Sequence, residues 1–115
     1  MARIRHMAVK TADVPKLADF YKNVFGLREV SRGKRSIYLS DGYINMAILP
    51  AEDGQEGIDH FGFEVEDLQK MADSALEAGA QQGSRDLPRD GRFAEVFIKD
   101  PTGQRVDLSK QGWKI

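Results

Sequence analysis

The sequence contains an internal repeat. Moving it by 54 positions lays His6 on His60, and these are the 2 histidines of the chain. Over residues 4–19 the same shift matches five further identical pairs, which are Ile4 with Ile58, Asp13 with Asp67, Lys16 with Lys70, Ala18 with Ala72 and Asp19 with Asp73. A repeat of this length constrains the architecture, because each copy should fold as the same supersecondary unit and bury its apolar face against its twin. We therefore predict one domain over residues 1–115, built from two similar halves.

Composition and charge exclude several classes of protein. The 115 residues are 41% hydrophobic, which suits one ordinary domain. The 17 basic and 18 acidic residues are mixed without a basic block, so we expect no nucleic-acid partner. No apolar run has the length of a membrane span or a signal peptide, and the absence of cysteine disfavours a secreted disulfide scaffold. We expect a cytoplasmic protein that binds a small molecule.

The first half, residues 1–50, reads as strand, helix and three strands. Ile4–Lys10 alternates as a half-buried strand does. Asp13 is a suitable N-cap and Gly26 a suitable C-terminal cap for a helix over Val14–Phe25, whose apolar residues recur at helical spacing. Three short strands are predicted at residues 27–31, 36–39 and 43–49, the last two joined by the turn dipeptide Asp41-Gly42.

The second half repeats this order after a linker at residues 51–57. A strand is predicted at residues 58–65, an N-cap at Asp67 and a helix at residues 68–78. Strands are then predicted at residues 80–84, 93–99 and 105–109, so that the second unit covers residues 58–109. Residues 110–115 form a tail, and we expect its Trp113 and Ile115 to dock.

Three residues form a candidate metal site. His6 and His60 come from related strands and can converge if the halves pair. Asp107 lies between Val106 and Leu108 on a strand otherwise suited to burial, where an inward carboxylate needs a cation or good hydrogen bonds. The repeat places Asn45 at the equivalent position of the first half. Two histidines and one carboxylate suit Fe(II), Mn(II), Ni(II) or Zn(II) and leave positions open for substrate, water or dioxygen.

The whole pattern closely resembles the vicinal oxygen chelate superfamily. The resemblance rests on the repeated order of elements, the histidine that opens each unit, and the segments FYKNVFGL at residues 20–27 and DPTGQRVDL at residues 100–108. That group contains glyoxalase I, extradiol dioxygenases, methylmalonyl-CoA epimerase, fosfomycin-resistance enzymes and bleomycin-binding proteins. The resemblance implies an α+β fold in which two tandem βαβββ units form an open, eight-stranded half-barrel around a divalent metal. It also implies a homodimer, with ligands at His6, His60 and Asp107.

Departures from the superfamily pattern bear on the reaction. Glyoxalase I and related isomerases place a glutamate or glutamine on the last strand of the first unit, where this chain has Asn45. The ligand set resembles that of the extradiol dioxygenases, but their additional active-site histidine has no counterpart, because both histidines are assigned as ligands. Proton transfer would then fall to Glu95, Tyr38 or Tyr43. Glu95 alternates with Phe93 and Phe97 on one predicted strand face, which favours a raised carboxyl pKa.

These observations lead to three functional hypotheses. The first is an Fe(II) dioxygenase that acts on a small oxygen-chelating substrate, with Asn45, Tyr38, Tyr43 and Phe97 lining the pocket. The second is a glyoxalase-like lyase or isomerase that works through an enediolate, with Glu95 as its acid or base. The third is a non-catalytic small-molecule binding protein, such as an antibiotic-binding relative, in which the histidines serve packing alone.

Overall fold

The computed structural model describes residues 1–84 and 95–115. These residues divide into two compact units. One unit combines His6–Asp59 with Trp113–Ile115, and we call it the first-half unit; the other combines Met1–Arg5 with His60–Gly112, and we call it the second-half unit. The tip of the C-terminal tail therefore belongs with the first half of the sequence.

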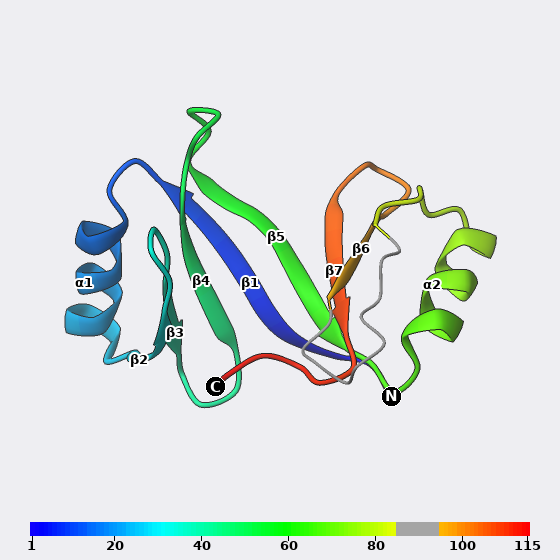
Figure 1. The fold of residues 1–115 in the computed structure, drawn as a ribbon, viewed down its shortest axis with the longest axis horizontal. Coiled ribbons are helices and arrows are strands. Elements are labelled where there is room, and N and C mark those ends of the chain that lie inside the picture. Colours follow the sequence, from blue (N-terminus) through cyan, green and yellow to red (C-terminus); the bar gives the residue numbers. More distant parts are fainter. Residues whose placement is uncertain (85–94) are drawn as a thin grey trace. The chain divides into compact units, whose positions relative to one another are not determined.

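The first-half unit is a four-stranded sheet covered by one helix. Its strands, in the order β2-β3-β4-β1, are β2 (Arg28–Arg32), β3 (Ile37–Ser40), β4 (Asn45–Pro50) and most of β1 (Arg3–Thr11). Strands β1 and β4 run parallel, whereas β4 with β3 and β3 with β2 run antiparallel. Helix α1 (Val14–Phe25) lies against β3 and β4 (Figure 1).

Local chemistry fixes the ends of α1. The side chain of Asp13 accepts a hydrogen bond from the backbone N–H of Lys16, which satisfies one of the donors left open at a helix start. Gly26 ends the helix in the left-handed conformation, with φ of 72°, and its N–H donates to the carbonyl of Lys22. The predicted helix bounds are confirmed.

The second-half unit repeats this design with fewer described strands. Strands β5 (Gly57–Glu64), β7 (Arg105–Ser109) and β6 (Val96–Lys99) lie side by side in that order, with β5 and β7 parallel and β7 and β6 antiparallel. Helix α2 (Leu68–Glu77) begins at the N-cap Asp67 and packs on β6 and β7 (Figure 1). The repeated arrangement of elements confirms the repeat seen in the sequence.

Alternation of side chains along the strands separates the core from the opposite face of each sheet. The core of the first-half unit is Val9, Ala18, Ile37, Leu39 and Ile48. The core of the second-half unit is Val65, Ala72, Val96, Val106 and Leu108. In both units the core side chains meet the helix, so the residues between them on each strand point to the other face of the sheet.

The α+β class with an open, mixed sheet is confirmed, with seven strands in the described ranges instead of the predicted eight. The prediction of a strand at residues 80–84 is wrong. Gln81 exchanges two backbone hydrogen bonds with Lys99 in an isolated bridge. Beyond it, the N–H of Phe97 donates to the hydroxyl of Ser84 at 3.1 Å. Because a side chain supplies this acceptor, the regular ladder does not continue.

The starts of two other strands differ from the prediction by two or more residues. Strand β4 begins at Asn45, because one carboxylate oxygen of Asp41 accepts hydrogen bonds from the N–H groups of both Tyr43 and Ile44 and holds them in the turn. Strand β6 begins at Val96, directly after Glu95. Phe93, which was predicted to share a face with Glu95, lies outside the described residues.

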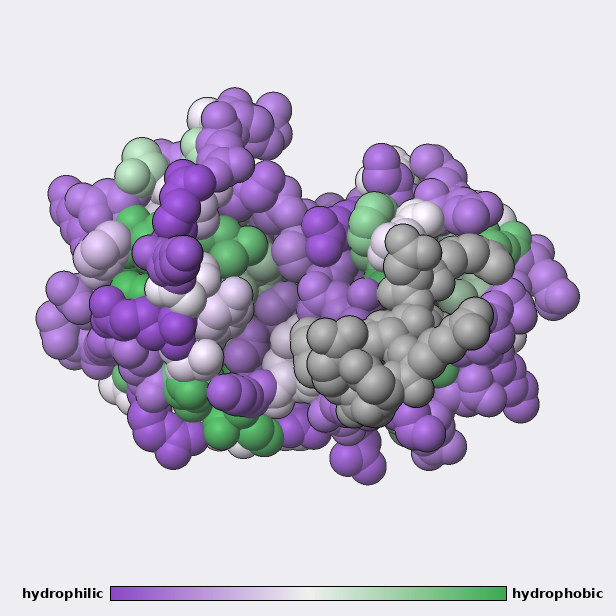
Figure 2. Space-filling model, viewed as in Figure 1, coloured by the Kyte–Doolittle hydropathy of each residue, from purple (hydrophilic) through white to green (hydrophobic). Residues whose placement is uncertain are grey.

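Some large apolar side chains are exposed, among them Phe20, Val24 and Phe25 on α1. The face drawn in Figure 2 is mainly hydrophilic, and its hydrophobic residues form separate patches. No helix in the described part of the chain is both long and apolar enough to span a membrane.

Candidate metal centre

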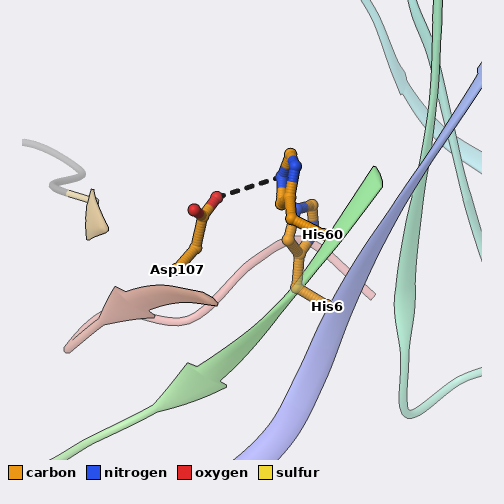
Figure 3. A group of neighbouring side chains, drawn as sticks. All are labelled: His6, His60 and Asp107. Atoms are coloured by element: carbon orange, nitrogen blue, oxygen red, sulfur yellow. Dashed lines mark ion pairs between the residues drawn. The ribbon is translucent and has the colours of Figure 1, made fainter. Parts of the chain in front are cut away.

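A buried histidine and a buried aspartate meet in the second-half unit. His60 on β5 and Asp107 on β7 are 5% and 0% exposed. The His60 Nε2 lies 3.1 Å from the Asp107 Oδ2 (Figure 3). In the parallel register Asp107 lies opposite Gly62, two positions beyond His60, so both side chains project from the same face.

Arg105 holds the other side of this carboxylate. Its Nε donates to the Asp107 Oδ1 at 2.8 Å, and its Nη2 lies 3.4 Å from Oδ2. Burial by itself raises the pKa of Asp107, but the hydrogen bonds from His60 and Arg105 outweigh that effect, so the pKa is lowered below its ordinary value. Asp107 is therefore a carboxylate at neutral pH, with Oδ1 held by Arg105 and Oδ2 facing His60.

The spacing of the pair fits a shared metal ion. Two ligand atoms that each lie about 2.1 Å from a metal and subtend about 90° at it are about 3 Å apart. The Nε2–Oδ2 distance of 3.1 Å matches this separation. The two atoms are thus spaced as two ligands of one divalent ion are.

The histidine of the first-half unit is held by different neighbours. His6 on β1 is 4% exposed, and its Nδ1 lies 2.9 Å from the Oδ1 of Asn45, its partner in the parallel register. The Nδ2 of Asn45 donates to the carbonyl oxygen of Lys114 at 2.7 Å. Because a carbonyl can only accept, this bond orients the amide so that its oxygen faces His6. The hydrogen-bond network therefore assigns the imidazole proton to Nδ1.

The tail docks on the same histidine. The rings of Trp113 and His6 are stacked, with centroids 4.6 Å apart and planes 8° from parallel. Docking of Trp113 is confirmed, whereas Ile115 is 41% exposed, so the expectation that it docks is wrong. The carbonyl oxygen of Lys114 already engages Asn45, so the tail ends beside His6 without burying its last side chain.

A model of the glyoxalase-like domain family matches residues 6–109. The chain belongs to the glyoxalase-like domain family. This family is part of the vicinal oxygen chelate superfamily, so the resemblance seen in the sequence is confirmed. The metallothiol transferase FosB of Lysinibacillus sphaericus is 24% identical over 118 residues, which cover 91% of this chain and 79% of that protein.

Two solved structures illustrate the shared fold. Methylmalonyl-CoA epimerase of Streptomyces coelicolor has a TM-score of 0.73 and 20% identity, over 93% of this chain and 92% of that chain. Homoprotocatechuate 2,3-dioxygenase of B. fuscum has a TM-score of 0.78 and 19% identity, over 98% of this chain and 33% of that chain. At these identities the likeness shows the fold alone.

The register corrects the internal equivalence expected within this glyoxalase-like domain. Asn45 lies opposite His6, whereas Asp107 lies opposite Gly62. The first-half counterpart of Asp107 is therefore Ala47, which lies opposite Ala8, and not Asn45. Asn45 and Ala47 still share one face of β4, because they are two residues apart. Matching the two halves by their sequence motifs does not reveal which residues pair across the strands, so it cannot detect a shift of two positions.

Of the other predicted site residues, two lie on strands and two lie just before a strand begins. Tyr38 lies opposite Ala47 on β3 and is half-buried, so it shares the face of His6 and Asn45. Phe97 lies opposite Asp107 on β6 and carries the guanidinium of Arg105 over its ring, 4.6 Å from the centroid. Tyr43 is 48% exposed in the turn before β4, and Glu95 is half-buried directly before β6.

Sequence reasoning missed the contact of Arg105 with Asp107 and the partner on which Trp113 docks. Arg105 precedes Asp107 by two residues on one strand, a spacing that places both side chains on one face and could have indicated their contact. Trp113 gave a weaker signal, because nothing in a short tail specifies where it docks.

Proposed function

We propose that this glyoxalase-like domain is a divalent-metal-dependent enzyme that acts on a small molecule through two of its oxygen atoms. In this proposal His6, His60 and Asp107 are the metal ligands. The observation that carries it is the buried His60–Asp107 pair, whose 3.1 Å separation fits two ligands of one ion. The repeat supports His6 as the third ligand, since it is the copy of His60 and is equally buried.

The donor set favours Fe(II) and dioxygenase chemistry. Two histidines and one carboxylate with open positions are the facial ligand set of non-haem Fe(II) oxygenases, although Mn(II), Ni(II) and Zn(II) accept the same donors. When bound, the ion would act as a Lewis acid and as a template that holds the substrate oxygens. We therefore propose an Fe(II) dioxygenase as the first specific function.

The residues of the chain would bind and orient the substrate. We propose that Tyr38, Asn45 and Phe97 line the binding site, because register places them on the same sheet faces as the candidate ligands. We propose Glu95 as the group that accepts or donates the proton. We also propose Tyr43, in the turn before β4, as a substrate contact.

A lyase or isomerase is the second candidate. The solved epimerase structure matches this chain over 93% of its own length and 92% of the epimerase, whereas this chain spans 33% of the dioxygenase. The shared fold therefore extends over nearly the whole epimerase chain but over only a third of the dioxygenase chain. In that reaction Glu95 would move a proton of the substrate, and the ion that His6, His60 and Asp107 would hold would supply a Lewis acid for the negative charge.

The assembly and location of the protein are also proposals. We propose a homodimer, because the superfamily resemblance implies one and because Phe20, Val24 and Phe25 leave apolar surface exposed on α1. We propose a cytoplasmic location because a chain without cysteine suits a reducing compartment. Light scattering of the purified protein tests the dimer.

Elemental analysis tests the function. The protein is purified without oxygen or chelators, beside the Asp107→Asn variant and the control Asp53→Asn, which makes the same change at a 52% exposed carboxylate. We expect about one iron per chain in the wild type and in Asp53→Asn, and none in Asp107→Asn, followed by oxygen uptake with a catechol or a related diol. Nickel, zinc or manganese at that level would favour the lyase or isomerase. No metal after reconstitution would refute both enzymes and leave a binding protein.

A further inference from the structure

We infer that Asn45, Trp113 and the backbone carbonyl of Lys114 are positioning groups that hold His6 with its proton on Nδ1 and so present Nε2 as the metal-binding atom. This inference rests on the proposed metal site and names what controls one of its ligands. The last residues of the chain would then set the geometry of a ligand that lies near its beginning.

A chain of two hydrogen bonds sets the proton position. The Lys114 carbonyl accepts from the Asn45 Nδ2 at 2.7 Å, and the Asn45 Oδ1 accepts from the His6 Nδ1 at 2.9 Å. Asn45 is 2% exposed, so water does not compete freely for either bond. A histidine ligand that donates its second N–H in this way has a fixed tautomer and ring orientation.

Stacking sets the ring plane. The Trp113 indole lies 4.6 Å from the imidazole and only 8° from parallel, so rotation of the His6 ring about its side-chain axis would break the contact. The hydrogen bond and the stack restrain the same ring in different directions. A ligand held in its productive orientation before the metal arrives loses less conformational freedom on binding.

The path of the tail is itself fixed by a turn. The N–H of Gly112 donates to the hydroxyl of Ser109 at 3.1 Å. Gly112 has φ of 72°, and a Cβ at this position would collide with the Glu64 side chain. The positive φ therefore favours glycine here, whereas the Glu64 atom nearest to such a Cβ is the carboxylate end of a flexible side chain that can move.

His60 is oriented by other means. Its Nε2 lies 3.1 Å from Asp107, so in both halves the nitrogen assigned to the metal is Nε2. In the first half the orienting group is a neutral amide tied to the tail. We therefore expect changes in the tail to affect His6 and to leave the His60–Asp107 pair in place.

The first experiment measures the tautomer of His6 in metal-free protein by ¹⁵N NMR. We expect the Nδ1–H form in the wild type, and the Nε2–H form or an exchanging mixture in Asn45→Leu and in a chain that lacks residues 113–115. Trp113→Phe, which keeps a ring for stacking, should retain the Nδ1–H form. The Nε2–H form in the wild type would overturn the inference, whether or not the protein binds a metal.

The second experiment measures the affinity for Zn²⁺ by titration, with the emission of Trp113 as the signal, since it is the 1 tryptophan of the chain. Asn45→Leu should bind about 10- to 100-fold more weakly, as expected when the group that orients a histidine ligand is removed. Asn45→Asp, which keeps an acceptor for Nδ1–H, should recover most of the affinity. Ile115→Ala is the matched tail control and should bind like the wild type.

The outcomes separate the two proposals. If the wild type binds Zn²⁺ and Asn45→Leu binds it equally well, the positioning role is refuted and the metal site stands. If the wild type binds no metal, the proposed function fails, and the NMR experiment alone decides whether the tail fixes the tautomer. The circular dichroism spectrum of each variant shows whether it folds, and Asn45→Asp keeps the test decisive if Asn45→Leu does not.

Discussion

The Arg105→Met variant tests whether the carboxylate of Asp107 depends on its cationic neighbour in metal-free protein. Asp107 is completely buried, and Arg105 donates to it at 2.8 and 3.4 Å. Methionine keeps an unbranched stem against Phe97 but removes the charge and both donors. Among the residues that the structure describes, the buried carboxylate would then keep only His60 as a partner, which is an unfavourable state for a buried charge.

The magnitude follows from the contacts. A hydrogen bond to a charged group contributes about 1.5–3 kcal/mol, and a cation–π contact adds about 0.5–1 kcal/mol. Only the 2.8 Å bond has good length, and Arg105 is 38% exposed, so water can replace part of what is lost. We expect Arg105→Met to lower the free energy of unfolding by about 2–3 kcal/mol at neutral pH.

Urea unfolding of chelator-treated protein measures this loss. The folded-state pKa of Asp107 is below its ordinary value of 3.8, so its stabilisation is present above that pH and is lost as the pH falls through the folded-state pKa. The gap between wild type and variant should therefore narrow in acid. Arg32→Met removes a similarly hydrogen-bonded but 55% exposed arginine from Glu29, a carboxylate that is itself 29% exposed, and should cost less. Equal midpoints for Arg105→Met and the wild type would refute the role given to Arg105.

Two further predictions concern the fold. The hydrogen bonds and charges of Arg32 and Lys22 lower the pKa of Glu29 to about 2, so its stabilising contribution should be present above its ordinary value of 4.5 and be lost between there and pH 2. In Glu29→Gln the free energy of unfolding, measured with urea, should therefore depend less on pH below 4.5 than in the wild type. The same pH dependence in both proteins would refute the stabilising role of Glu29. Asp13→Ala and Asp67→Ala each remove an N-cap and should each lower the free energy of unfolding by about 1 kcal/mol, with a loss of helical circular dichroism on heating. If either variant unfolds like the wild type, that cap is not a stabilising contact.

Local sequence signals predicted the helices well. Asp13 and Asp67 each accept a hydrogen bond from the amide three residues further along the chain, so a few neighbouring residues determine where each helix starts. Strand ends were harder to predict, because they depend on competition for hydrogen bonds. The Asp41 carboxylate accepts hydrogen bonds from the amides at the expected start of β4, and the Ser84 hydroxyl accepts one from the amide of Phe97 in β6.

The candidate ligands were predictable because the repeat identifies them. His6 and His60 coincide under one shift, and Asp107 is a carboxylate on an apolar strand. The groups that orient them were not predictable in the same way. The contact between Asn45 and Lys114 joins residues 69 positions apart, and no local pattern specifies a contact between a strand and a distant tail.

The pairing register of the strands could not be predicted from the sequence either. Whether Asn45 or Ala47 is the counterpart of Asp107 depends on which residues of β1 and β4 lie opposite each other. Two positions along a strand preserve the face, so the alternation of apolar and polar residues is the same for both alternatives. Only the hydrogen-bonded pairing decides between them.

A metal titration of the His6→Ala variant tests the central claim most directly, because that claim assigns ligands from both halves of the chain to one ion. Calorimetry of chelator-treated wild type with Mn²⁺ or Zn²⁺ should give one ion per chain, and His6→Ala, His60→Ala and Asp107→Ala should each bind far more weakly. Binding by His6→Ala with the affinity of the wild type would contradict the claim and leave His60 and Asp107 as a site of their own.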